Sequence, residues 1–268
     1  MKPKRRRGLV ELRPGELLAE TGAARFLGRL DASALRGEFE AAGLLTGLAQ
    51  RGFSPVSLDL SREQDEHRLL VRATGPGAEE MPPLVELRCA EPTLLLRDLD
   101  PRPEGVEVLS VLAIRWLAMQ DPLSRFTPAR PRLPGQRYPG LGLARPLILR
   151  LRDWARAWGK DALVNFPEFF HNAVFYSAFY RFASARLQGR FEALRRDLAG
   201  LDIASASHAV EDGRVIEEPA GSGLRWEAGE MLLPLTEPVR DFLEGAAYQA
   251  ARERTCEAVR FWVRGEAA

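Results

Sequence analysis

The sequence predicts an α+β protein with a mixed, mostly antiparallel central sheet flanked by helices, and with an added C-terminal helix. Three observations predict this. A helical pattern comes first, short strand-like segments follow it, and a strand–helix–strand–helix passage occupies residues 106–182. The chain has 268 residues, 46% of them hydrophobic, which is enough for one large domain with a packed core.

The N-terminal part predicts helices and then a meander of strands. Residues 1–14 are rich in Lys and Arg and predict a flexible basic tail. Residues 16–53 repeat apolar side chains near a 3.6-residue period, and Gly52 ends that pattern. Four short β-type segments follow, separated by polar or Gly/Pro turns, and predict an antiparallel meander: residues 55–60, 68–73, 84–89 and 94–99.

The middle of the chain holds the strongest pattern. Residues 106–120 are apolar enough for a central strand or a buried helix, and periodicity leaves both open. A connection punctuated by prolines then leads to a helix that begins near residue 143, with Pro146 in its first turn and Gly159 at its end. One face of this helix carries an apolar stripe: Leu143, Leu147, Leu151, Trp154 and Trp158.

The C-terminal part predicts alternating short elements. Residues 162–167 form a candidate buried strand, and residues 168–182 an aromatic helix. A helix over 190–200 and two strands, within 203–210 and 224–235, follow; Thr236 is placed to cap a terminal helix through about Val263. We therefore divide the chain into the tail, a main domain over 15–235 and a C-terminal helical extension over 236–268.

The charge is balanced overall but not locally. The chain has 38 basic and 37 acidic residues, yet residues 121–160 hold nine basic residues and two acidic ones, a net +7, so the remainder sums to −6. A compact basic patch on an otherwise acidic chain suits a small anionic ligand better than a nucleic acid, which needs a broader positive face.

Several kinds of site are excluded by the motifs. The sequence has no paired His or Cys spacing for a metal, no Gly-x-Ser-x-Gly nucleophile elbow, no phosphate-binding Gly-Lys-Ser/Thr and no full dinucleotide fingerprint. Cys89 and Cys256 stand far apart, which predicts buried thiols and no disulfide. With no long apolar segment and no signal-like start, we expect a cytoplasmic protein that is not bound to a membrane.

What remains is a candidate anion site between Arg137 and the helix that follows it. Gly140 and Gly142 let the backbone approach a ligand closely, and the unpaired N–H groups of a first helical turn favour negative charge. Arginine adds a bidentate phosphate contact. Such an arrangement can hold a pyrophosphate, although an ordinary glycine turn accounts for the same residues.

This segment resembles the acyl-CoA-binding signature of the GNAT superfamily of N-acetyltransferases. In that family Arg-x-x-Gly-x-Gly precedes an amphipathic helix, and a strand and an Asn-x-x-Ala-x-x-x-Tyr segment come after it. Here Asn172 and Tyr176 stand in the second segment, and Tyr176 lies 39 residues after Arg137, as the family pattern leads us to expect. The two signals in register cover residues 106–182.

The resemblance implies a GNAT-like fold that binds acetyl-CoA or another acyl-CoA between two separating strands, and transfers the acyl group to an amine. Tyr176 would protonate the departing thiolate, although an aromatic stripe on a helix is also typical of a core. No metal is implied. The residues implied in binding acyl-CoA are Arg137, Gly140, Leu141, Gly142, Leu143 and Asn172.

The chain departs from the family pattern at four places and leaves other functions open. Pro139 lacks a backbone donor, Arg181 replaces a usual glycine, and the link over 122–136 is longer than usual. In a fourth departure, Ala173 follows Asn172 directly, without the two intervening residues of the family pattern. The alternative function is a GNAT-like module without catalysis that binds a ligand or a partner; nucleic-acid binding is a weaker third. Glu107, Glu168 and His171 are candidates for a general base, and the sequence identifies neither the amine acceptor nor the oligomeric state.

Overall fold

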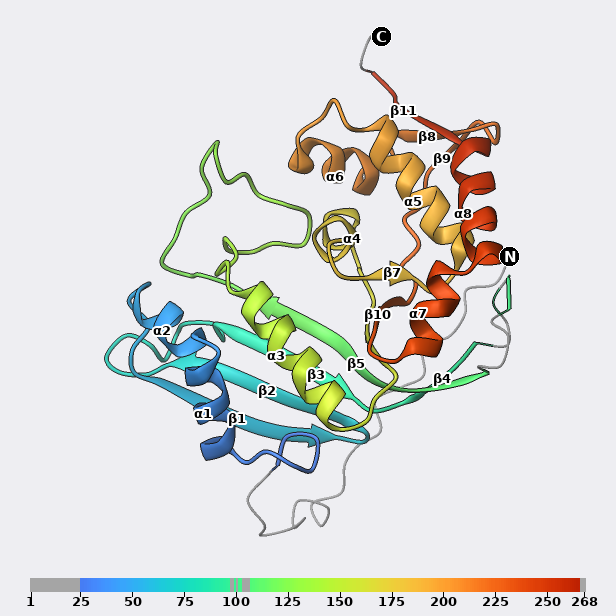
Figure 1. Ribbon diagram of the computed structural model, residues 1–268. Coiled ribbons are helices and arrows are strands. Elements are labelled where there is room, and N and C mark those ends of the chain that lie inside the picture. The colour runs from blue at the N-terminus through green and yellow to red at the C-terminus, as the bar shows by residue number, and fades with distance from the viewer. Residues whose placement is uncertain (1–24, 97–98, 100, 103–106, 266–268) are drawn as a thin grey trace, which may run out of the picture.

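The computed structural model of the chain describes residues 25–96, 99, 101–102 and 107–265. Its main sheet has the strand order β1–β2–β3–β5–β6–β10–β7, and β4 pairs with β5 outside this path (Figure 1). The strands are β1 (Val56–Glu63), β2 (Glu66–Ala73), β3 (Val85–Ala90), β4 (Thr93–Leu95), β5 (Val108–Met119), β6 (Ala162–Asn165), β7 (Arg181–Phe182) and β10 (Met231–Pro234). Among the described strands of this sheet, β5 and β6 alone run parallel. The predicted α+β class with a mixed, mostly antiparallel sheet is confirmed.

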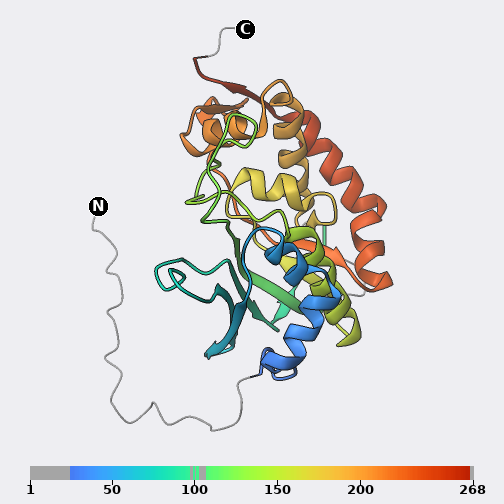
Figure 2. The ribbon, with the colours of Figure 1, turned by 90° about the vertical axis from the view of Figure 1, so that its left-hand side faces the viewer.

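Helices cover one face of this sheet along most of its width. The described helices are α1 (Ala32–Ala41), α2 (Leu44–Ala49), α3 (Ala144–Ala157), α4 (Phe170–Tyr176), α5 (Ala185–Asp197), α6 (Ile203–Glu211), α7 (Glu237–Glu244) and α8 (Ala246–Ala258). Figure 2 shows α1 and α3 on the same side of the first strands. The two helices are joined where Trp154 Nε1 donates to the Glu38 carboxylate at 3.1 Å.

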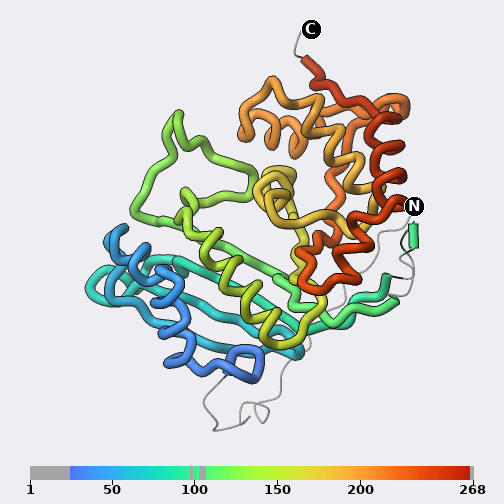
Figure 3. The backbone as a smooth tube through the Cα atoms, in the orientation of Figure 1, coloured from blue at the N-terminus to red at the C-terminus, as the bar shows by residue number. Residues whose placement is uncertain are grey.

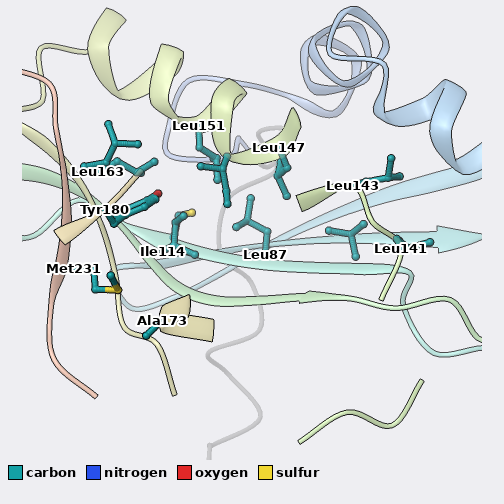
Figure 4. Packing of buried hydrophobic residues seen from close by; sticks show 14 of the residues in the cluster. Leu87, Ile114, Leu141, Leu143, Leu147, Leu151, Leu163, Ala173, Tyr180 and Met231 are labelled. Carbon is teal, nitrogen blue, oxygen red and sulfur yellow. The ribbon is translucent and has the colours of Figure 1, made fainter. Parts of the chain in front are cut away.

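The apolar stripe of α3 forms the centre of the core, as the sequence predicts. Leu147 and Leu151 are fully buried and point toward Leu87 and Ile114 of the sheet (Figure 4). Burying each leucine contributes about 2 kcal/mol, so this stripe fixes the position of α3 over β5. The helix stops at Gly159, whose φ of +67° lies in the region that glycine adopts without strain.

The second face is covered by the C-terminal segment over β5, β6 and β10. Val239 and Leu243 of α7 pack there against Val111, Val164 and Leu232. Beyond β7, α5, α6 and α8 gather around a small antiparallel sheet of β8 (Val215–Glu218), β9 (Ser222–Gly223) and β11 (Arg260–Val263). Because β11 pairs with β8, the C-terminal segment is joined to the segment between β7 and β10.

Four predicted elements differ from the structure. Residues 203–210 form a helix and not a strand, because Asp202 accepts hydrogen bonds from the Ala204 and Ser205 amides and starts α6. The aromatic helix ends at Tyr176, and β4 pairs with β5, so the meander stops at β3. The predicted C-terminal helix is two helices and a strand, with a break at Gly245.

Three further predictions concern residues 106–120, the cap at Thr236 and the N-terminal tail. For residues 106–120 the sequence left both a strand and a helix open, and in the structure residues 108–119 form strand β5. Thr236 precedes α7, but its side chain makes no capping hydrogen bond. The basic tail over 1–14 and the start of the first helical pattern lie outside the described residues. None of the described helices combines the length and apolar character that crossing a bilayer requires.

We expect Gly189→Ala to destabilise the protein, because α5 and α8 approach each other closely at Gly189. A β-carbon there would overlap the Arg252 carbonyl oxygen and lie 2.8 Å from Thr255 Cβ. Overpacking of this kind costs about 2–3 kcal/mol in the free energy of unfolding, measurable by urea denaturation. Gly37→Ala is the matched control, because Gly37 lies in exposed α1 with nothing near its β-carbon position, and should stabilise by about 0.5–1 kcal/mol. Equal effects of the two substitutions would contradict this packing.

Candidate functional site

The site begins where β5 and β6 stop pairing. The parallel pairing runs from Val111 and Ala162 to Ile114 and Asn165, and there it ends. β5 continues to Met119 in pairing with β3, with a bulge at the step after Ile114. The edge of β5 from Arg115 to Ala118 therefore faces no strand among those described and is open to an extended ligand, whereas the Met119 carbonyl accepts from the Leu141 amide.

The long loop after β5 leaves the sheet and returns to the same place. The Asp121 amide donates to the Pro139 carbonyl at 2.7 Å, and the Leu141 amide to the Met119 carbonyl at 3.3 Å. Figure 3 shows the trace of residues 121–139 as a wide excursion that closes at its base. The start of α3 consequently lies beside the Met119 end of β5, where β5 and β6 no longer pair, whatever the length of the loop. We call this the open end of the separation between the two strands, and the point at Ile114 and Asn165, where their pairing stops, the closed end.

Four backbone amides at the start of α3 have no acceptor among the described residues. They belong to Gly142, Leu143, Ala144 and Arg145, and we call them the cradle. Gly142, with φ of +69°, makes the turn into the helix. No side chain caps α3 and no acidic residue occupies its first turn, so the positive end of the helix dipole is uncompensated.

Three of the described helices differ from α3 in this respect, whereas α2, α4, α7 and α8 also begin without a side-chain cap. Asp31, Ser184 and Asp202 each accept a backbone hydrogen bond at the start of α1, α5 and α6. An uncapped start is therefore not peculiar to α3. At α3 the amides lie beside Arg51, and this combination is an arrangement that can bind anions.

The cradle begins and ends later in the chain than the predicted segment, which ran from Gly140 to Leu143. Leu141 does not offer its amide, because that amide is bonded to Met119 and the side chain is 1% exposed. Gly140 precedes the cradle and pairs with Gln120 as an isolated bridge. The missing N–H of Pro139 does not weaken the site, since Pro139 lies before the four amides. Of the residues that the sequence singled out, Gly142 and Leu143 contribute amides to the cradle.

Arg51 borders the cradle, and the sequence did not single it out. A β-carbon on Gly142 would lie 3.6 Å from Arg51 Nη2, while Arg51 Nη1 donates to the Gly47 carbonyl at 2.7 Å. Gly47 in turn leaves room for the Leu143 side chain, which fills the space where a β-carbon would be. No local sequence pattern predicts a contact between segments so far apart in the chain.

The predicted basic patch is partly neutralised. Arg150 pairs with Glu38, Arg152 with Asp153 and Lys160 with Glu91. The predicted ligand Arg137 is exposed, with its guanidinium 5.5 Å from the Tyr138 ring centre. Arg145, in the first turn of α3, lies 6.0 Å from the Phe179 ring centre.

Phe179, whose ring faces Arg145, comes three residues after the predicted catalytic tyrosine. Tyr176 ends α4, is half-buried, and packs edge-on against Tyr180 at 5.7 Å between ring centres. Burial raises the pKa of Tyr176 to about 12, so its hydroxyl keeps its proton at neutral pH. Asn172, predicted to bind acyl-CoA, is half-buried in α4, and its side chain makes no hydrogen bond among the described residues.

Two further polar side chains lie buried at the closed end of the separation. Asn165 is 2% exposed and Tyr180 is fully buried, and neither the carboxamide nor the hydroxyl has a hydrogen-bond partner among the described residues. Leaving such groups unpaired costs about 1–3 kcal/mol each. The signal in the sequence was a polar residue at the end of the otherwise apolar strand Ala162–Asn165.

The general-base candidates do not meet at the site. Glu168 and Glu107 are exposed. His171 is buried, with its ring stacked on Phe169 at 5.5 Å between centres, and burial followed by the charge of His208 lowers its pKa to about 4. His171 is therefore neutral, and no base for an amine stands out among the described residues.

The described residues offer no cluster of metal ligands. The residues that the structure describes contain no group of three or more His, Cys, Asp and Glu side chains placed to hold a metal ion. Cys89 is fully buried, which raises its pKa well above the usual range, and Cys256 is half-buried.

Comparison with known proteins identifies no relative: no protein-family model matches the chain, and no curated protein matches it.

We expect His171 to make the protein sensitive to acid. The unfolded chain binds a proton at His171 near pH 6.5 and the folded protein only near pH 4, so folding stability falls as the pH falls through that window. The expected loss is about 3 kcal/mol, measurable by urea denaturation across the window. In His171→Phe this slope should flatten. An unchanged slope would show that His171 is not the group responsible.

Proposed function

We propose that the protein is an acyl-CoA-dependent N-acyltransferase of the GNAT type, transferring an acetyl or similar group to an amine. The observation that carries the proposal is the cradle at the open end of the separation between β5 and β6. Four amides of one helix start have no acceptor among the described residues, and the Arg51 guanidinium lies beside Gly142; this combination is suited to a diphosphate. A cytoplasmic location is part of this proposal.

The arrangement of strands supports the same ligand. CoA carries a diphosphate at one end of a long uncharged arm and a thiol at the other. The cradle would hold the diphosphate, and the arm would extend along the unpaired edge of β5 toward Ile114 and Asn165, where the strands rejoin. Tyr176 would then stand near the thioester end.

The proposed reaction requires from the protein one group that donates a proton to the departing sulfur. A bound acyl-CoA supplies a thioester carbonyl that an amine can attack, giving an amide and a thiol. Tyr176 holds a proton that it can give to the sulfur as the carbon–sulfur bond breaks. The proton lost by the amine nitrogen returns through solvent to the phenolate, so that the balance is one amine and one thioester to one amide and one thiol.

A second candidate function is ligand binding without catalysis on the same framework. The observation that favours it is the absence of a base at the site among the described residues, together with the pKa of about 12 for Tyr176, which makes the phenol a weak acid. Release of free thiol from acetyl-CoA in the presence of amines distinguishes the two candidates, since only the first function produces it.

We expect CoA to stabilise the protein and Gly142→Asp to abolish that effect. At about 100 times its Kd a ligand stabilises the folded state by about 2.7 kcal/mol, a rise in Tm of several degrees. A carboxylate beside the amides and Arg51 repels the diphosphate and takes up the donors. Arg137→Ala should weaken CoA binding to a smaller extent, because Arg137 is exposed.

The matched control is Gly159→Asp at the other end of α3. Gly159 has nearly the same backbone strain, φ +67° against +69°, but lies away from the cradle. The Tm of the free protein should fall in both variants, whereas the shift produced by CoA should disappear only in Gly142→Asp. Absence of any shift in the wild type at millimolar CoA would overturn the proposal.

We expect Tyr176→Phe to slow acyl transfer without weakening CoA binding. Removing a general acid lowers kcat by about 10²–10⁴-fold, whereas the Kd for CoA depends on the cradle and should change less than about twofold. The measurement is thiol release from acetyl-CoA under saturating amine, with Kd measured by calorimetry. Full activity of Tyr176→Phe would remove this residue from the reaction.

A further inference from the structure

A groove lies between α5, α8 and the turn that joins β8 to β9, and an apolar cleft adjoins it. The groove has a volume of about 530 Å³ and the cleft about 20 Å³. Arg190 and Glu227 line both of them, so the ion pair between these two side chains forms the boundary. This region follows β7 in the chain, and none of its lining residues belongs to the cradle (Figure 1).

We propose that the groove and the cleft together bind a small organic carboxylate that carries a compact apolar group. The carboxylate would lie among the arginines of the groove, and the apolar group would enter the cleft. The inference goes beyond the proposed function and does not depend on it, because it concerns a segment that acyl-CoA binding leaves unused.

The groove carries more positive charge than its own carboxylates neutralise. Arg186 and Arg190 stand four residues apart on α5 and so lie on the same side of that helix, and Arg254 of α8 lines the same groove. Arg190 pairs with Glu217 and Glu227. Arg186 and Arg254 are exposed, and no carboxylate of the described residues pairs with either. Three guanidinium groups therefore face two carboxylates, which favours the binding of a further anion.

The contact between Arg190 and Glu227 shows how a carboxylate is bound at the mouth of the cleft. Arg190 donates through Nε and Nη2 to the Glu217 carboxylate, at 3.1 and 2.6 Å, and its Nη1 lies 3.0 Å from Glu227 Oε1. The Arg190 and Glu217 side chains are each 17% exposed, whereas that of Glu227 is 49% exposed. Glu217 thus holds the guanidinium in place, and Glu227 occupies a position that a ligand carboxylate can take, because an exposed ion pair contributes little.

The cleft favours an apolar group over water. Leu187 and Phe191 of α5 line it together with Trp226 and Phe261. The Trp226 indole N–H already donates to the Pro167 carbonyl at 2.9 Å, so this polar group of the lining is satisfied. A water molecule needs about 10–15 Å³ and several hydrogen-bond partners, which an apolar lining does not supply. The cleft therefore suits one compact group, such as the branched end of a short aliphatic chain.

The first test compares three small molecules on the full wild-type chain. Isovalerate has a carboxylate and a branched apolar end, isovaleramide has the same shape without the charge, and acetate lacks the apolar end. We expect isovalerate to shift the NMR signal of the Trp226 indole N–H, which is assigned by its loss in Trp226→Phe. Isovaleramide and acetate should each have a Kd at least about fivefold higher than that of isovalerate.

The second test uses the opposite effects of two charges in the groove. Glu227→Gln frees Arg190 Nη1 and should lower the Kd for isovalerate about threefold to fivefold, whereas Arg254→Gln should raise it by a similar factor. Glu253→Gln is the matched control, because Glu253 is an exposed carboxylate of α8 that pairs with Arg252 and does not line the groove. This variant should change the Kd by less than about twofold.

Three results would overturn the inference. They are the absence of any shift of the Trp226 signal with isovalerate, an equally low Kd for isovaleramide, and an unchanged or higher Kd for isovalerate in Glu227→Gln. The Tm of each variant shows whether it is folded, and the comparison of ligands on the wild type decides the matter where a variant is not. CoA binding is measured separately, so none of these results affects the proposed function.

Discussion

The early end of the pairing between β5 and β6 is the constraint on which the candidate site depends. β5 is long and stays paired with β3 to Met119, whereas β6 follows it only as far as Asn165. A strand edge left without a partner in the middle of a sheet is unfavourable unless water or another molecule takes up its backbone groups. The bulge next to Ile114 marks the point of separation and increases the local twist, which holds the two strands apart.

Two later segments of the chain stabilise this arrangement from the far side. The segment between β7 and β10 and the C-terminal segment share a small sheet through the pairing of β8 with β11, and α5 packs closely on α8. α7 covers β5, β6 and β10 on the face opposite α3. Both faces of the sheet are thus packed around the closed end of the separation. The strands there cannot easily slide to extend their pairing, since a slip in register would move buried residues of both faces.

The sequence predicted the local elements well and the long-range contacts poorly, for physical reasons. Helix α3, its stop at Gly159 and most strands depend on periodicity and turn residues, which are local. Residues 203–210 were mistaken for a strand because small alternating residues fit either period, and the deciding cap, Asp202, lay outside the pattern. The approach of Arg51 to Gly142 depends on how α2 docks, which no local pattern contains.

Two kinds of unmet hydrogen bonding lie at the two ends of the same separation. The open end has amide donors without acceptors at the start of α3, where α1, α5 and α6 each use a side chain to cap theirs. The closed end has neutral buried groups, Asn165 and Tyr180, for which the described part of the chain supplies no hydrogen-bond partner. Amides at a helix start attract negative charge, and a buried carboxamide beside a phenol excludes it. The start of α3 therefore suits an anionic group, whereas the buried closed end offers only neutral hydrogen-bonding groups.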